Sequence, residues 1–202
     1  RHEDPQVIYD TNVGLVQQLI EACDTASVQP KIIFASSTQE ERDNLYGKSK
    51  RDGRKLLEQW AETHNASVTS MVIPNVFGPF GLPFYNSFIA TFCHQINHGE
   101  QPTIINDSQV NLIYINKLSE EFFNEIINTS QEINKYMVPH SSSRKVSEIL
   151  ELLLTYKKEY VDNGSVPKVD LNSFELDLFN TFTSYIPKDY FPRKFVKHSD
   201  NR

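Results

Sequence analysis

Residues 31–50 have the sequence KIIFASSTQEERDNLYGKSK and carry the strongest indication of fold class in this 202-residue chain. The run KIIFASS at 31–37 is short and apolar, as is typical of a strand buried in a parallel sheet. Turn-forming residues follow at 38–45, and helical spacing of apolar residues begins at Tyr46 and continues to Asn65. The order strand, turn, helix predicts one unit of an α/β protein.

The same alternation of helices and strands extends on both sides of this stretch. Residues 5–25 have helical spacing, 67–73 form the next apolar run, and 74–83 are a loop rich in proline and glycine. This alternation predicts a parallel sheet with helices on both faces. Ligands of such sheets bind at the carboxyl ends of the strands, so the loops after Ser37 and Ile73 are the most informative.

Beyond residue 83 the sequence predicts a second, smaller α/β lobe. The expected elements are helices at 85–98, 117–128, 146–160 and 172–186, and strands near 103–105, 110–115 and 135–138. We therefore expect residues 1–80 to form the first domain, 81–186 mainly the second lobe, and 187–202 a connector.

Composition argues against several classes of protein. Asp and Glu outnumber Lys and Arg by 26 to 20, whereas a protein that grips nucleic acid is usually basic. No apolar run approaches the roughly 20 residues of a membrane-spanning helix. Cys23 and Cys93 form no disulfide pattern, so we expect a cytoplasmic protein. From the charge and the apolar runs we expect it to bind neither nucleic acid nor membranes. The first residue is Arg1 and the glycines number seven, which together suggest a fragment of an enzyme.

The strongest chemical motif is Tyr46-Gly-Lys-Ser-Lys50. A tyrosine and a lysine four residues apart share one face of a helix. A tyrosine hydroxyl ordinarily has a pKa of about 10, and an ammonium group one turn away favours the phenolate and brings proton transfer nearer to neutral pH. The preceding strand ends in Ser36-Ser37, so its hydroxyl groups are expected to face the tyrosine across a ligand.

The pattern FASS at 34–37 followed by YGKSK at 46–50 resembles the signature of the extended short-chain dehydrogenases/reductases, in the NAD-dependent epimerase/dehydratase superfamily. Three further motifs agree with that family in order: the Asn-bearing helix at 12–23, PNVFGP at 74–79, and VNLIYIN at 110–116. The resemblance covers most of residues 7–130. It implies a partial Rossmann-like parallel sheet flanked by helices, with a smaller C-terminal substrate-binding lobe.

Several segments resemble more narrowly the reductase domain of the CapF-type enzymes of capsular polysaccharide synthesis. They are DNLY at 43–46, FYNSFIATFC at 84–93 and VPKVD at 166–170. The resemblance implies an NADPH-dependent (or NADH-dependent) reductase of a 4-keto UDP-sugar, of the UDP-2-acetamido-2,6-dideoxy-hexulose type. It also implies a C-terminal cupin domain, whose entry would be HSDNR at 198–202.

The resemblance assigns roles to the catalytic candidates. Tyr46 would be the general acid that protonates the keto oxygen, and Lys50 would bind the nicotinamide ribose and favour the phenolate. Ser37 would hydrogen-bond the same oxygen, with Thr38 as the alternative and as a substrate contact. Without the family, Ser37 is as readily a hydroxyl group that only satisfies the end of its strand.

Residues after the second strand would contact the ligands. Pro74 and Val76 would line the nicotinamide side together with Tyr46 and Lys50, and Asn75 would contact the nucleotide sugar. Taken alone, Asn75 would be a turn residue that follows a proline.

Departures from the family pattern leave other functions open. The turn Gly-x-x-Gly-x-x-Gly, which holds a dinucleotide pyrophosphate at a helix N-terminus, is absent, so we expect the first strands upstream of Arg1. Val72 replaces an arginine common in the family, and Asn116-Lys117 replaces aspartates. One alternative is a nucleotide-sugar epimerase or dehydratase of the same superfamily. The other is a non-catalytic fragment that folds by associating with itself or with a missing lobe. An uncovered sheet edge tends to find a partner, so we expect a homo-oligomer.

The histidines do not predict a metal site. His94 and His98 have metal-ligand spacing beside Cys93, but no carboxylate lies nearby in the sequence. We interpret them as surface histidines of a helix.

Overall fold

The chain folds into two compact units, described here for residues 4–190 in a computed structural model. The first unit contains the residues up to Val76 together with Val110–Ser143, and the second contains Phe77–Gln109 and the residues from Arg144 onward. The chain thus leaves the first unit close to the expected boundary at residue 80. Residues 110–143 return to the first unit, whereas they were expected in the second lobe.

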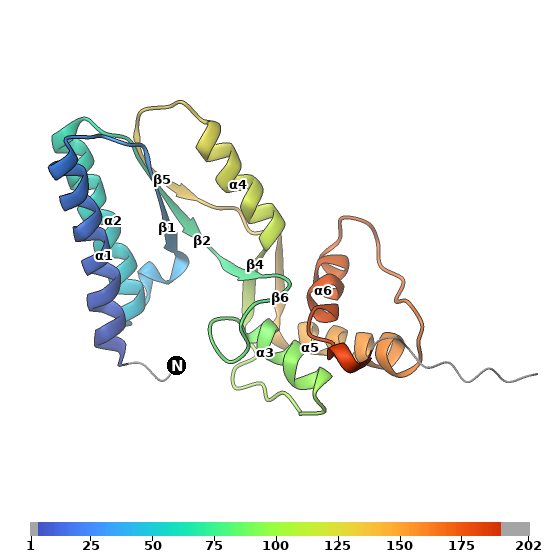
Figure 1. The fold of residues 1–202 in the computed structure, drawn as a ribbon. Coiled ribbons are helices and arrows are strands. Elements are labelled where there is room, and N and C mark those ends of the chain that lie inside the picture. Colours follow the sequence, from blue (N-terminus) through green and yellow to red (C-terminus); the bar gives the residue numbers. More distant parts are fainter. Residues whose placement is uncertain (1–3, 191–202) are drawn as a thin grey trace, which may run out of the picture. The chain divides into compact units, whose positions relative to one another are not determined.

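A three-stranded parallel sheet forms the centre of the first unit (Figure 1). Its strands are β1 (Ile32–Ser37), β2 (Val68–Ile73) and β5 (Ile133–Met137), in the order β1-β2-β5. Ser37 lies opposite Ile73, so β1 and β2 end at the same level. The predicted parallel sheet is confirmed, and the segments after these two strands emerge together.

Two long helices cover one face of this sheet, side by side (Figure 1). They are α1 (Pro5–Ala26), which Asp4 caps, and α2 (Leu45–His64), which Asn44 caps. Both end at a residue in the left-handed conformation, a common way to satisfy the last carbonyl groups. Their shared core with β1 and β2 consists of Val16, Cys23, Ile32, Leu57, Trp60, Ala61 and Val68.

Helix α4 (Ile115–Ile127) covers the opposite face of the sheet (Figure 1). Leu118 of this helix packs with Met71 and Ile73 of β2, whereas Val68 of the same strand faces α1 and α2. Side chains of a strand point alternately to its two faces, so β2 is buried on both sides. Helices therefore flank the sheet on both faces, as the sequence predicts.

A second sheet has the order β3-β4-β6, and its strands lie where the chain passes from one unit to the other. They are β3 (Asn75–Phe77), β4 (Gln109–Tyr114) and β6 (Ser142–Lys145). Strand β4 was expected, but β3 lies in the predicted loop and β6 was not predicted. The strand expected near residues 103–105 is wrong, since Ile105 is 99% exposed and the segment has no regular structure.

The second unit is mainly helical within the described residues. It contains α3 (Phe88–Asn97), α5 (Val146–Tyr156) and α6 (Phe174–Thr183). Helix α5 continues as a wider π-helical segment, η2 (Lys157–Asp162), and η3 (Lys188–Tyr190) is a single short turn. The three α-helices contact one another, and their fully buried side chains include Ile89, Cys93, Ile149, Leu153, Leu178 and Phe182.

Two expectations concern parts of the chain that the structure does not describe or describes only in part. Most of the expected connector at 187–202, and the expected entry to a cupin domain at 198–202, lie outside residues 4–190.

Within the described residues, no helix combines the length and the apolar character needed to cross a membrane.

Candidate active site

The carboxyl end of β1 presents the first candidate residues. Ser37 is the last residue of β1, and its Oγ accepts a hydrogen bond of 3.2 Å from the backbone N–H of Gln39. Ser37 thereby caps η1 (Thr38–Glu41), a short 3₁₀ turn, and Thr38 is exposed at its start. The Ser37 hydroxyl thus satisfies a backbone N–H group just after its strand, and the Ser37 residue is half-buried.

Tyr46 lies in the first turn of α2, and the neighbouring Gly47 fixes where that turn sits. Asn44 Oδ1 accepts the N–H of Gly47 at 2.8 Å, which starts the helix. A Cβ atom on Gly47 would lie 1.9 Å from the carbonyl oxygen of Gln39. Only glycine allows the start of α2 to approach the η1 backbone this closely, so Tyr46 is held next to the segment that follows Ser37.

Lys50 lies one helical turn after Tyr46 and extends back toward β1. Its Nζ is 5.9 Å from the centroid of the Tyr46 ring and 5.3 Å from that of Phe34. The same Nζ donates a 3.2 Å hydrogen bond to the carbonyl oxygen of Ala35 in β1. Burial lowers the pKa of the Lys50 ammonium. The structure thus brings Tyr46 and Lys50 together beside the end of β1.

A hydrogen-bonded chain from α1 supports this helical turn. Asn12 Nδ2 donates to Ser49 Oγ at 2.9 Å, and Ser49 Oγ donates to the carbonyl oxygen of Tyr46 at 2.7 Å. Ser49 is buried between the two helices. In the sequence, Asn12 stands out only as part of the helix at 12–23 that resembles the family, and its contact with Ser49 was not predicted. The position of Ser49 between Tyr46 and Lys50 was the available signal.

The segment after β2, which continues into β3, contains three candidate residues in different environments. Pro74 is buried, and Val76 packs against the core that contains Ile73. Asn75 is exposed, and its Nδ2 donates to the carbonyl oxygen of Asn111 at 3.1 Å. The three residues follow β2 at the level of Ser37, and their contacts with ligands stay predictions.

These groups offer the chemistry of proton transfer to a bound carbonyl compound. A phenol can donate a proton, a nearby ammonium group favours the resulting phenolate, and a serine hydroxyl can hydrogen-bond the reacting oxygen. Tyr46 and Lys50 supply the first two groups from one helix, and Ser37 supplies the third from the strand that precedes it. A reduction of this kind also needs a hydride donor, which a bound dinucleotide supplies.

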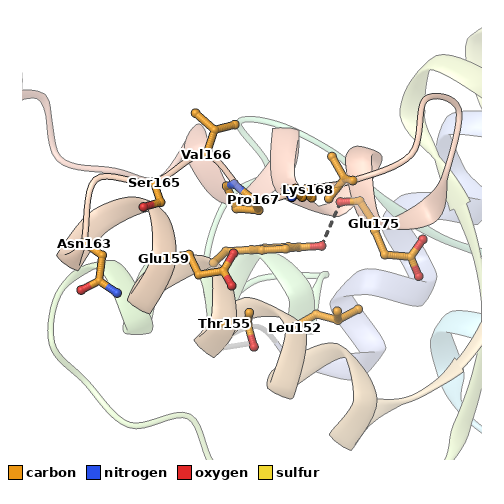
Figure 2. A pocket seen from close by; sticks show the side chains of 11 residues that line it. Leu152, Thr155, Glu159, Asn163, Ser165, Val166, Pro167, Lys168 and Glu175 are labelled. Atoms are coloured by element: carbon orange, nitrogen blue, oxygen red, sulfur yellow. Dashed lines mark hydrogen bonds between the residues drawn. The ribbon is translucent and has the colours of Figure 1, made fainter.

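The second unit contains a separate cavity of about 580 Å³ beside α5 and the segment after it (Figure 2). Tyr156 is one of its lining residues and donates a 2.9 Å hydrogen bond to the carbonyl oxygen of Glu175. The charged residues among its lining are Glu159, Lys168 and Glu175. Two carboxylates and one ammonium group do not attract a diphosphate, so we do not assign a nucleotide site to this cavity.

His94 of α3 and His98, the residue that ends this helix, stack on each other. The rings of His94 and His98 have centroids 3.9 Å apart, and Phe84 packs edge-on against His94. Cys93 is fully buried, and burial strongly raises the pKa of its thiol. Among residues 4–190 no group of three or more His, Cys, Asp or Glu side chains is arranged to hold a metal ion.

Comparison with known proteins identifies the family of this chain. The sequence model of the NAD dependent epimerase/dehydratase family matches residues 1–118, so the chain belongs to this family. The family resemblance inferred from the motifs is thereby confirmed.

Particular relatives support the narrower resemblance. The chain is 30% identical over its whole length to UDP-2-acetamido-2,6-beta-L-arabino-hexul-4-ose reductase from Pseudomonas aeruginosa, and covers 54% of that protein. It is 32% identical to the crystal structure of the capsular polysaccharide assembling protein CapF from Staphylococcus aureus, with a TM-score of 0.80. That alignment covers 93% of this chain and 51% of CapF. The chain therefore spans about half the length of these relatives.

A more distant structure agrees in fold. RMD from Pseudomonas aeruginosa, solved in complex with NADPH, has a TM-score of 0.75 at 16% identity, over 91% of this chain and 76% of RMD. The expected Rossmann-like α/β class is confirmed by these structural matches and by the parallel sheet.

Proposed function

We propose that this chain is the part of an NADPH-dependent reductase that carries the proton donor for a 4-keto UDP-sugar. The observation that carries the proposal is the pairing of Tyr46 with the partly buried Lys50 at the end of β1. The similarity to a UDP-hexulose reductase along the whole chain supports a ketone substrate. The function belongs to the full-length protein, of which this chain carries about half if its length matches that of the relatives.

In the proposed reaction a ketone gains a hydride at carbon and a proton at oxygen, and becomes an alcohol. Tyr46 gives its hydroxyl proton to the oxygen, and Lys50 stabilises the phenolate that remains. Ser37 donates a hydrogen bond to the same oxygen, with Thr38 as the alternative donor. NADPH, when bound, supplies the hydride.

The residues present fit one end of the cofactor. The Lys50 ammonium and the Tyr46 hydroxyl are donors suited to the hydroxyl groups of the nicotinamide ribose, and Pro74 and Val76 are apolar groups suited to the nicotinamide ring. The glycine-rich turn that holds a pyrophosphate is not in this sequence. We therefore assign only the nicotinamide end of the cofactor to this chain.

The proposed substrate is a UDP-sugar of the 2-acetamido-2,6-dideoxy-hexulose type, as a precursor of capsule or surface polysaccharide. Asn75 has an exposed amide next to the end of β2 and is the proposed contact to the nucleotide sugar. The resemblance to CapF-type enzymes extends the proposal to a C-terminal cupin domain and a homo-oligomer in the full-length protein.

Product analysis with the full-length protein tests this proposal. We expect oxidation of one NADPH for each UDP-2-acetamido-2,6-dideoxy-hexulose consumed, and a product that carries a hydroxyl group at C4. A product epimerised without net consumption of NADPH would instead favour an epimerase of the same family. Absence of any turnover in the full-length protein, with the cofactor bound, would favour a non-catalytic role.

A further inference from the structure

A buried carboxylate lies in the short segment that joins the two proposed catalytic residues. Glu40 stands between Ser37 and Tyr46 in sequence, and its residue surface is only 2% exposed. Its carboxylate accepts a hydrogen bond from the hydroxyl group of Ser36, the neighbour of Ser37 in β1. A buried carboxylate is costly unless it is paired and hydrogen-bonded, so its partners matter.

Helix α2 provides the principal partner of Glu40. Arg54 Nε donates to the two carboxylate oxygens of Glu40 at 3.2 and 3.0 Å, and its Nη2 lies 3.0 Å from Oε2. The other side of the guanidinium binds Glu58 at 2.8 Å, one turn further along the helix. Burial by itself lowers the pKa of Arg54, but the hydrogen bonds and charges of both glutamates outweigh it and raise that pKa.

Two further contacts hold Glu40, one at its backbone and one at its carboxylate. Arg51 donates to the carbonyl oxygen of Glu40 at 3.3 Å, and Lys135 Nζ of β5 lies 3.9 Å from its carboxylate. Glu40 therefore links the end of β1 to two turns of α2 and to β5, the strand on the far side of β2. The close approach of Gly47 to Gln39 attaches the same segment to the start of α2.

We propose that Glu40 is a positioning residue of the active site. Through its hydrogen bond from Ser36 and its ion pair with Arg54, it sets the separation of Ser37 and Tyr46. The inference rests on the proposed function, since it assumes that Ser37 and Tyr46 act on one substrate oxygen. Eight residues separate the two, and a segment of this length holds a fixed geometry only if it is anchored to the fold. Misplacing reacting groups by about 1 Å can cost about 10²-fold in rate.

The structure offers a matched control for a role that is only structural. Glu125 of α4 is also buried, accepts a 2.7 Å hydrogen bond from Thr69 Oγ1, and pairs with Lys31 at 2.8 Å. Thr69 and Lys31 lie at the amino ends of β2 and β1, opposite the end that carries the site. Loss of either buried glutamate should destabilise the fold, but only loss of Glu40 should disturb the geometry of Ser37 and Tyr46.

The experiment compares Glu40→Gln, Glu125→Gln and Tyr46→Phe in the full-length protein, well below the melting temperature of each variant. For Glu40→Gln we expect kcat for NADPH oxidation with the 4-keto UDP-sugar to fall about tenfold or more, with KM for NADPH changed less than about twofold. Glu125→Gln should lower the melting temperature while kcat stays within about twofold of wild type. Equal kcat in the two glutamate variants would overturn the proposal.

A second variant keeps the test decisive if Glu40→Gln does not fold. Arg54→Lys keeps the positive charge beside Glu40 but removes the planar fork that fixes its carboxylate. We expect it to fold and to show the same selective fall in kcat, and an unchanged kcat would overturn the proposal. Tyr46→Phe distinguishes failure of the proposed function from failure of the proposed role of Glu40. Near-normal activity of Tyr46→Phe would refute the proposed function itself.

Discussion

At the scale of single residues, the environment of Lys50 supports the role proposed for it. Its ammonium is partly buried and donates to the backbone carbonyl of Ala35, a neutral acceptor that does not cancel its charge. The positive charge therefore remains effective at the Tyr46 ring, whose centroid is 5.9 Å away. Because burial lowers the pKa of Lys50, this charge is lost at a lower pH than in an exposed lysine.

Replacement of Lys50 by methionine should change both cofactor binding and pH dependence. A reduction that needs a protonated tyrosine slows as the pH rises through the titration of that hydroxyl. Without the ammonium the phenolate is less favoured, so the alkaline limb of the pH–rate profile should move to higher pH. We expect KM for NADPH to rise as well, since the proposed donor to the ribose is lost. Steady-state rates across pH, measured on the full-length protein, check this expectation.

Lys55→Met is the matched control for this substitution. Lys55 lies on the same helix and is exposed. It should leave the pH–rate profile and KM for NADPH unchanged. If Lys50→Met behaves like Lys55→Met, Lys50 is only a surface residue of α2.

At the scale of elements, the junction of η1 with α2 depends on one glycine. A methyl group on Gly47 would collide with the carbonyl oxygen of Gln39, whereas one on Gly14 of α1 would meet nothing within 4 Å. Gly47→Ala should therefore destabilise the protein by about 1–3 kcal/mol through overpacking. Gly14→Ala should stabilise it by about 0.5–1 kcal/mol, as for an ordinary helix position. Urea unfolding of the two variants measures both effects.

Measuring kcat of the same two variants shows whether this junction also positions Tyr46. Gly47→Ala should also lower kcat, because Tyr46 moves with the first turn of α2. Gly14→Ala should leave kcat unchanged. A Gly47→Ala variant as stable as wild type would show that η1 can shift without cost.

The elements that sequence reasoning found are those encoded by local pattern. The spacing of Tyr46 and Lys50 is fixed by helix geometry, so the pattern alone placed them on one face. The short strands β3 and β6 exist only through pairing with β4, a partner distant in sequence, and the polar run at Ser142–Lys145 has no strand signal. Glu40 was missed for a similar reason, since a charged residue in a turn looks solvated until Arg54 is brought against it.

At the scale of the whole molecule, the 202-residue chain has a sheet whose first strand is at an edge. Within the described residues β1 pairs with β2 on one side, and Ala35 in this strand is exposed. Uncovered strand edges tend to pair with another chain. Without the glycine-rich turn, this chain on its own should bind NADPH weakly or not at all, and should retain at most weak binding of UDP.

Light scattering and calorimetry on the 202-residue chain check these expectations. We expect self-association that Ala35→Lys reduces, because a charge on an edge strand opposes pairing. Leu15→Glu, which alters an exposed side chain of α1, serves as the control for association through that helix. A monomer that binds NADPH with micromolar affinity would contradict both expectations.

The most direct test of the central claim is the rate of NADPH oxidation by full-length Tyr46→Phe with a 4-keto UDP-sugar. The substitution removes the hydroxyl group and leaves the ring beside Lys50, so the fold and cofactor binding should persist. The rate should fall by about 10² to 10⁴, the usual contribution of general acid catalysis, while circular dichroism and the melting temperature stay close to wild type. A rate within about threefold of wild type would contradict the assignment of Tyr46 as proton donor, and with it the proposed active site.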